Sequence, residues 1–387
     1  MPKQRLPAEL WLEVFQWATF TSSDAAYTTN YKPFEPLGRY EVLDQSLKVK
    51  AVVVRVCRQW RALAEYMLYE DLRIRHGEQA LADVLESCEE RGRWVRRAEL
   101  PYTNTVTTTP SSLRPLPFIA ILKRCPELEI LVRPVPRFFD KLPFEFDAEG
   151  LPLTSLKRLE WWNSNEATRS GGINSLDEVL SCTPNLQYLL IGGERWMSQR
   201  APPLLPSLTT LRLRWMNNQF IRQICQWSLP ALSHVVIDNS HCSAVLEMLW
   251  ETFGSQIRIV ELGKHVRFYI EDHITPLLRV CPSLQELNYH IYFTVPPHSV
   301  IKHSSIHSVR LHGNVNLLAT DGDWEHISCH FAWFYGPSLP SLERIILYGE
   351  WSAILTDNRF NYIHCALVTR KCALERPDGT VIQVTAG

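Results

Sequence analysis

Residues Leu208–Leu213 read LTTLRL and follow directly on Leu205-Pro206-Ser207, and this short pattern decides the fold. Its first, fourth and sixth positions are apolar, and a Leu-Pro or Cys-Pro pair introduces many of its copies. Similar strings begin at Val95, Leu128, Leu156, Leu186, Leu232, Ile257, Leu284, Ile306 and Leu342. Successive starts are 33, 28, 30, 22, 24, 25, 27, 22 and 36 residues apart, so the chain contains an internal repeat.

Helical periodicity appears between these strings, at 175–182, 218–227, 243–253 and 274–280. The fold class predicted is therefore α/β, with short parallel strands alternating with helices. The repeat resembles degenerate leucine-rich repeats, whose periods are about 20–29 residues, although the asparagine turn of their consensus is largely missing. Because each unit can bury its apolar face only against its neighbours, the units should stack as a solenoid.

Side chains between the apolar positions of each strand should point to the opposite, open face of the sheet. In repeat proteins such a face often binds a partner, and Arg, Tyr and Trp are enriched among the anchors of interfaces. A merely solvated face is the alternative. The candidate substrate-binding residues are Arg158, Glu160, Trp162, Tyr188, Arg212, Arg214, His234, Asp238, Glu286, His290, Arg310, His312, Arg344 and Tyr348.

Two amphipathic stretches precede the repeat. Residues 6–19 read LPAELWLEVFQWAT, and residues 47–72 read LKVKAVVVRVCRQWRALAEYMLYEDL. Pro7 suits the first turn of a helix, where its missing N–H costs nothing. Both stretches carry more large apolar side chains than a short helix buries alone, so some of them should face a partner.

The strings LPAELWLEVF, VCRQWRALA and LYEDL resemble the F-box family, in the layout with leucine-rich repeats that is common in fungal members. The resemblance implies docking on the Skp adaptor and, through it, on the cullin of a ubiquitin ligase. The adaptor-binding residues it implies are Leu6, Pro7, Leu10, Val14, Phe15, Val56, Cys57, Trp60, Leu63 and Leu68. The alternative is a pair of ordinary core helices.

The sequence departs from the F-box pattern by an insert at about residues 20–46, rich in turn-forming residues. This insert should be mobile or draped over the helices. The domains expected are an all-α F-box-like module at 1–74, the solenoid at 75–348 and a C-terminal cap with a hairpin at 349–387.

Composition argues against several other classes of function. The formal charge of -1 lacks the basic excess of a nucleic-acid binder or a membrane-surface binder. No apolar run reaches about 18 residues, and the first ten residues lack the apolar core of a signal peptide, so a cytoplasmic or nuclear location is expected. The ten cysteines show no paired metal spacing. His326, Cys329 and His330 lie close together but lack further ligands at recognisable spacing, so neither metal nor cofactor is expected.

The leading prediction is a non-catalytic substrate receptor of a Skp–cullin–F-box ubiquitin ligase. The first alternative is a structural protein that uses the F-box to bind the adaptor without ubiquitylation. The second alternative, an enzyme in its own right, lacks a nucleophile elbow, a phosphate-binding loop or a dinucleotide motif.

Overall fold

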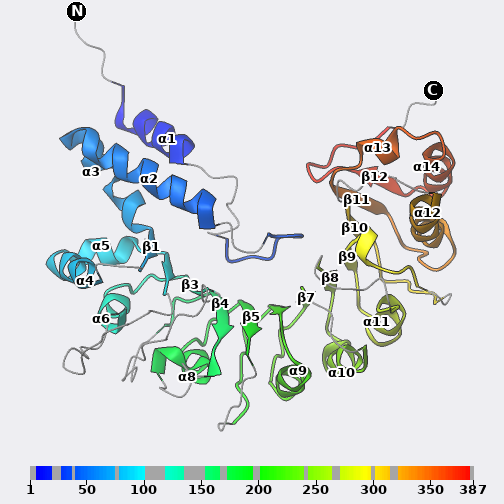
Figure 1. Cartoon of the computed structure of the whole chain (residues 1–387), viewed down its shortest axis with the longest axis horizontal. Helices are drawn as coiled ribbons and strands as arrows, with labels where there is room; N and C mark the ends of the chain where they lie inside the picture. The colour runs from blue at the N-terminus through cyan, green and yellow to red at the C-terminus, as the bar shows by residue number, and fades with distance from the viewer. Residues whose placement is uncertain are drawn as a thin grey trace, which may run out of the picture. The chain divides into compact units, whose positions relative to one another are not determined.

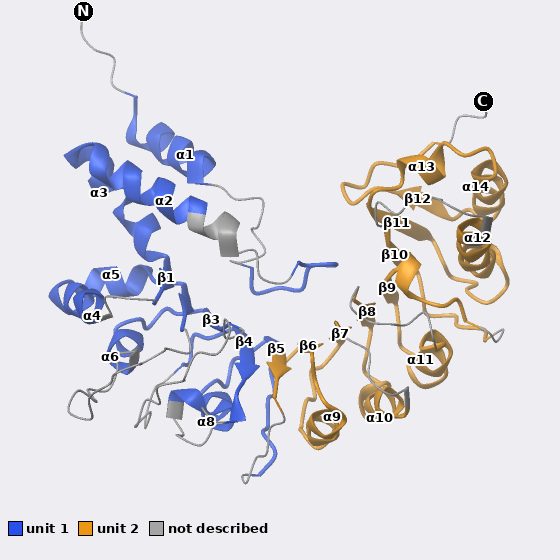
Figure 2. Ribbon diagram, viewed as in Figure 1, with its two compact units in different colours: residues 1–189, 198–207 blue, residues 190–197, 208–387 orange. Residues whose placement is uncertain are grey.

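A computed structural model shows a mixed α/β protein in which short parallel strands alternate with helices, as predicted (Figure 1). It describes residues 6–19, 28–36, 40–74, 78–100, 118–134, 153–165, 172–194, 201–238, 243–263, 271–297, 301–313 and 321–383. The chain divides into two compact units, residues 1–189 with 198–207 and residues 190–197 with 208–387 (Figure 2).

Three helices form the N-terminal part: α1 (Ala8–Thr19), α2 (Tyr40–Val56) and α3 (Arg58–Tyr69). The helix predicted from Leu47 begins earlier, so the insert is shorter than its composition indicated. Cys57 separates α2 from α3 because its backbone is extended (φ -160°, ψ 168°), and its sulfur accepts a hydrogen bond from the Trp60 backbone N–H. Ser46 Oγ donates to the Thr19 carbonyl over 2.7 Å and so ties α2 to the end of α1.

The strands of the described residues form one parallel sheet in chain order. They are β1 (Asp71–Arg73), β2 (Arg97–Glu99), β3 (Ile130–Arg133), β4 (Arg158–Asn163), β5 (Tyr188–Gly193), β6 (Thr210–Arg214), β7 (His234–Ile237), β8 (Ile259–Leu262), β9 (Glu286–His290), β10 (Ser308–Gly313), β11 (Arg344–Gly349) and β12 (Ala373–Glu375). The sheet thus continues by β1 and β12 beyond the stretch in which the sequence pattern is visible.

Helices connect most of the strands. They are α4 (Glu78–Ser87), α5 (Glu89–Trp94), α6 (Phe118–Lys123), η3 (Gly172–Asn174), α8 (Leu176–Ser181), α9 (Asn218–Ile224), α10 (Ser243–Phe253), α11 (Ile274–Val280), η4 (Ile291–Phe293), α12 (Asp321–Tyr335), α13 (Ser352–Leu355) and α14 (Phe360–Thr369). The four helical stretches predicted between the strands are confirmed as α8 to α11. In each unit these connecting helices cover one side of the strands (Figure 1).

The apolar positions of the repeat face these helices and form the core. In the second unit one register row runs Leu211, Val235, Val260, Leu287, Val309, Ile345 and Leu374, and all of these side chains are buried. Burying such a side chain contributes roughly 1.5–3 kcal/mol, so the row is a main source of stability.

The C-terminal hairpin is short. Its first arm is β12, which pairs parallel with β11, and its second arm makes a single antiparallel bridge from Val381 to Glu375. Gly379 closes the turn with a φ of +82°, a conformation that glycine adopts without strain.

Candidate functional site

The N-terminal helices share a small core. Phe15, Val53, Ala64 and Met67 are buried there, and Trp60 packs against them. The Trp60 ring lies 4.8 Å from the Phe15 ring and 4.7 Å from the Trp11 ring, centroid to centroid. These aromatic contacts fix α3 against α1, which determines the side chains that remain outside.

Large apolar side chains remain exposed along one side of α1 and the residues before it. Leu6, Leu10, Val14 and Trp17 expose 46%, 43%, 48% and 76% of their surface. Their spacing of three or four residues places them on one helical face. Solvent-exposed apolar rows of this kind mark interaction surfaces.

A second exposed row runs along α2, which packs against α1. Val49, Val52 and Val56 are 37%, 54% and 54% exposed and again lie three or four residues apart. Exposing valine to water is unfavourable, so this row also indicates a surface that a partner covers.

The structure divides the residues implied to bind the adaptor into two groups. Leu6, Pro7, Leu10, Val14, Val56 and Cys57 are exposed. Phe15 lies in the core with 1% exposure, and Trp60 and Leu63 pack against that core, while Leu68 is half-buried. Phe15, Trp60 and Leu63 therefore position the exposed rows, and Phe15 has no surface to offer a partner.

The open face of the sheet is the side that carries Arg158, Glu160 and Trp162 in β4, opposite the helices. In β4 the intervening Leu159 and Trp161 are fully buried. In the second unit the register places His290 beside His312 and His312 beside Tyr348 on this face.

The candidates on the open face differ in exposure. Arg158, Tyr188, Arg212, Asp238, Glu286 and His290 are buried, each with at most 8% exposure. Glu160, Trp162, Arg214, His234, Arg310, His312 and Tyr348 are half-buried, and Arg344 is exposed. The buried ones are bound within the protein rather than available as free anchors.

Cross-strand ion pairs explain this burial. In the first unit, Arg97 binds Asp71 of the neighbouring strand at 2.6 Å and Glu99 of its own strand at 3.3 Å. Burial alone would lower the pKa of Arg97, but the adjacent carboxylates raise it above its usual value, so the guanidinium stays charged.

Two comparable pairs lie in the second unit. Arg212 binds both carboxylate oxygens of Asp238 at 2.7 and 2.8 Å, and both side chains are about 5% exposed. Arg310 binds both oxygens of Glu286 at 2.8 and 3.0 Å and donates to the Tyr348 hydroxyl at 3.0 Å. Such bidentate geometry is the strong form of an ion pair.

Arg158 differs because its closest carboxylates include one from outside the sheet. Its guanidinium binds both oxygens of Glu35 at 2.7 and 3.3 Å and donates to the Thr28 carbonyl at 3.1 Å. It also binds Glu160 at 2.7 Å and lies 4.2 Å from the centre of the Tyr188 ring. The described part of the insert therefore contacts β4, where the sequence indicated a mobile segment or one draped over the helices.

Two residues of this region were missed at the sequence level. Glu35 lies within a stretch of turn-forming residues and carries no signal of its own. Arg133 occupies the sixth, normally apolar position of its repeat and is buried on the helix side, where it donates to the Ile173 carbonyl and to Asn174. A charged residue at an apolar repeat position was the available signal for Arg133.

Both histidines of α12 lie within hydrogen-bond distance of other groups of the protein, and His330 is fully buried while His326 is half-buried. His330 Nδ1 lies 2.9 Å from the Tyr289 hydroxyl and its Nε2 lies 2.9 Å from the Thr294 carbonyl, while His326 Nε2 lies 2.7 Å from the Ile291 carbonyl. Burial lowers the pKa of His330 to about 3. Across the described residues, no group of three or more His, Cys, Asp or Glu side chains is arranged to hold a metal ion.

The repeat cysteines are packing residues. Burial raises the pKa of Cys125 and of Cys281 to about 12, so both remain protonated and unreactive at neutral pH. Cys182 lies four residues before the first apolar position of its repeat, one more than Cys125 and Cys281, and is half-buried.

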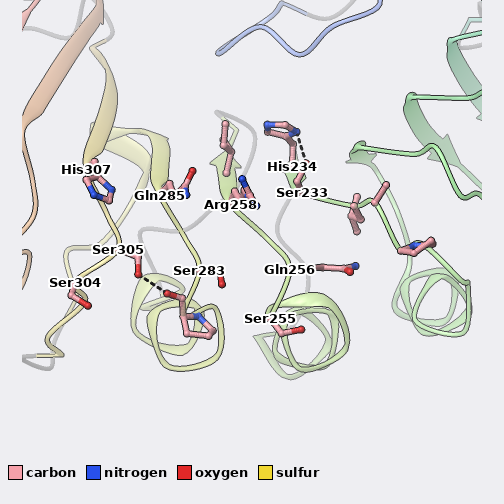
Figure 3. A pocket seen from close by; sticks show the side chains of 15 residues that line it. Ser233, His234, Ser255, Gln256, Arg258, Ser283, Gln285, Ser304, Ser305 and His307 are labelled. Carbon is pink, nitrogen blue, oxygen red and sulfur yellow. Dashed lines mark hydrogen bonds between the residues drawn. The ribbon is translucent and has the colours of Figure 1, made fainter.

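A polar groove of about 920 Å³ lies in the second unit, along the loops that precede β7 to β10 (Figure 3). His234, Arg258 and His307 line it together with several serines. Burial lowers the pKa of His234, so that ring is neutral at neutral pH. The groove offers many hydrogen-bonding groups and few charges, a lining suited to a peptide backbone.

No protein-family model matches this sequence, and no curated protein is significantly similar to it. Among solved structures, a leucine-rich repeat-containing protein, LegL7 from Legionella pneumophila, is similar over 81% of this chain and 92% of its own, with 13% identity and a TM-score of 0.44. The leucine-rich-repeat-like fold is established here by the chain's own register of parallel strands and connecting helices. No helix among the described residues has the length and apolar character to cross a bilayer.

Proposed function

We propose that this protein is a non-catalytic substrate receptor of a Skp–cullin–F-box ubiquitin ligase, acting in the cytoplasm or nucleus. The N-terminal helices α1–α3 hold the Skp adaptor, and through it the cullin, while the repeat sheet holds a protein substrate. The receptor contributes proximity, because it keeps a substrate lysine near a charged conjugating enzyme on another subunit.

The observation that carries this proposal is the exposed apolar row of Leu10, Val14 and Trp17 on α1, with Leu6 just before the helix. The row begins at the Leu-Pro pair on which the F-box resemblance depends, and the aromatic core behind it fixes its orientation. Covering such a row with a partner removes about 25 cal/mol of unfavourable hydration per Å² of apolar surface.

The repeat sheet supports the second half of the proposal. Solenoids of this kind present long surfaces that serve as binding scaffolds. Half-buried Trp162 and Arg214, exposed Arg344 and the polar groove beside His307 are among the accessible parts of this surface. The alternative, a structural protein that binds the adaptor without ubiquitylation, uses the same helices and differs only in the steps after adaptor binding.

Titration of the full chain with purified Skp adaptor tests the docking face. The double variant Leu10→Ser/Val14→Ser should weaken binding about tenfold or more, since interface anchors typically cost over 1 kcal/mol when truncated. Val368→Ser on α14 is the matched control, because this valine is 59% exposed on a helix of the second unit. Absence of adaptor binding by the wild-type chain would refute the proposal.

Reconstitution then separates receptor from structural protein. Proteins that co-purify with the full chain serve as candidate substrates. They are combined with the chain, the adaptor, the cullin–RING subunits and a charged conjugating enzyme. Ubiquitin transfer that requires the wild-type α1 face supports the receptor. Adaptor binding without recruitment of the cullin supports the structural alternative.

A further inference from the structure

The segment 28–36 lies against the open face of the sheet at β4, on the side opposite the helices (Figure 1). Its contact is centred on the bidentate pair of Arg158 and Glu35, whose side chains are only 3% and 5% exposed. The two residues are 123 positions apart in sequence, so this is a tertiary docking contact and not a local turn.

We propose that Arg158 and Tyr188 form a carboxylate-binding site on the open face, and that Glu35 is its internal occupant, which an acidic segment of a partner protein displaces. That this partner is a ubiquitylation substrate rests on the proposed function. The exchange of one carboxylate for another at Arg158 is independent of the proposed function.

The chemistry of the site selects a carboxylate. The guanidinium donates through Nη1 and Nη2 to both oxygens of the Glu35 carboxylate, and this bidentate geometry matches a carboxylate. The centre of the Tyr188 ring lies 4.2 Å from the guanidinium carbon of Arg158, so the ring packs against one face of the guanidinium. Arg158 additionally donates to the carbonyl of Thr28, so a short extended peptide around the acid fits the site better than a free ion.

We expect the Arg158–Glu35 ion pair to open more readily than the ion pairs of Arg97 and Arg212. Arg97 and Arg212 take their acids from the sheet and its immediate edge, Asp71 in β1 and Asp238 directly after β7. When Glu35 leaves, Arg158 keeps Glu160 at 2.7 Å, so the guanidinium retains a counter-charge. The usual penalty for stripping a buried ion pair of one partner is thereby reduced.

The segment itself is held with some strain. Phe34, immediately before Glu35, has a φ of +56°, which is unfavourable for a bulky side chain. Glu35 is also the single buried residue of the segment, since its neighbours are half-buried or exposed. Release of Glu35 would relax Phe34, which favours exchange, while the hydration that the Glu35 carboxylate gains is offset by the hydration that the incoming carboxylate loses.

Peptide binding in trans tests the proposal. The probe is a fluorescein-labelled peptide of residues 28–36 (TTNYKPFEP), with a second peptide in which its glutamate is glutamine. Full-length wild type, Glu35→Gln and Glu35→Gln/Arg158→Gln are titrated by fluorescence anisotropy. The control variant is Glu129→Gln, which removes a more exposed pair with Lys157 at 3.1 Å in the same unit.

The Glu35→Gln chain should bind the glutamate peptide about tenfold or more tightly than wild type, because the internal segment no longer occupies the site. The glutamine peptide and the Arg158→Gln double variant should lose this gain, and Glu129→Gln should behave as wild type. Equal affinity of wild type and Glu35→Gln would overturn the proposal. A Glu35→Gln chain that fails to fold by circular dichroism would also overturn it, because exchange requires a stable undocked state.

Titration of the same samples with the Skp adaptor separates the two proposals. Peptide exchange without adaptor binding would leave the carboxylate site standing and refute the ligase assignment. Adaptor binding without peptide exchange would refute the carboxylate site and leave the ligase assignment standing.

Discussion

The N-terminal helices and the repeat sheet treat their side chains in opposite ways. On α1 and α2, Val14 and Val52 are about half exposed, at 48% and 54%. On the sheet even polar groups such as Arg212 and Asp238 are buried and bound to each other. The sheet pairs several of its charged groups with one another, whereas the helices leave rows of apolar side chains exposed.

This difference distinguishes a surface suited to permanent docking from a surface suited to selective recognition. Exposed valine and leucine gain free energy from almost any complementary apolar surface, which suits permanent docking. A face whose charges are already paired binds only ligands that match or replace a pair, which suits selective recognition. Arg158 is where the second principle allows an exchange.

The largest expected effect comes from breaking an ion pair of the sheet. Arg212→Met leaves the Asp238 carboxylate buried without its guanidinium and should lower the free energy of unfolding by about 3–5 kcal/mol. The matched control is Arg93→Met, because Arg93 pairs with Glu89 at 3.1 Å on an exposed helix surface. That change should cost at most about 1 kcal/mol. Denaturant unfolding measures both, and equal effects would contradict the distinction.

Truncating one leucine in each region should give the next largest contrast. Leu211→Ala empties space in the fully buried row of the sheet and should cost roughly 2–5 kcal/mol. Leu10→Ala removes a side chain that is 43% exposed, so its cost should stay below about 1 kcal/mol. If Leu10→Ala proves as costly as Leu211→Ala, the α1 row is packed in solution and the docking face is wrongly assigned.

A smaller effect should appear as pH is lowered. The pKa of His330 is about 3 in the fold, below its ordinary value of 6.5, because burial disfavours the imidazolium. The unfolded chain therefore takes up the proton first, so the stabilisation is complete above pH 6.5 and is lost as pH falls toward 3. At pH 5 the loss of this stabilisation should lower the free energy of unfolding by about 2 kcal/mol relative to its value above pH 6.5. The variant His330→Gln should show a flatter dependence of unfolding free energy on pH, and parallel curves would refute the assignment.

The repeat fold was predictable because its signal is local and recurrent. The apolar positions of LTTLRL, Leu208, Leu211 and Leu213, are all buried in the core, and the helical periodicity at 243–253 became α10 with the same bounds. Alternation along a strand also placed Arg212 and Arg310 on the open face, since successive side chains point to opposite sides. The two apolar rows of the N-terminal helices follow from the same periodicity.

The pairing on the open face was not predictable from these patterns. Alternation gives the direction of Arg158 but not its partner, because Glu35 is distant in sequence and lies in a stretch without periodicity. Arg133 shows the opposite failure, since a charged residue at an apolar position entered the core through hydrogen bonds to Asn174 and the Ile173 carbonyl. Ion pairs and polar contacts between distant segments depend on geometry that no local rule encodes.

The smallest expected effect on stability tests whether α2 belongs with α1 in the apolar docking surface. Val52→Ser replaces a side chain that is 54% exposed, so unfolding free energy should change by no more than about 0.5 kcal/mol. Self-association of the isolated chain should nevertheless decrease, because an exposed apolar group is removed, and light scattering at increasing protein concentration measures this. Val368→Ser on α14 is the control for a lone exposed valine of similar exposure, 59%. A loss of more than about 1 kcal/mol in Val52→Ser would show that this valine supports the fold, and equal scattering in both variants would show that the α2 row is ordinary surface.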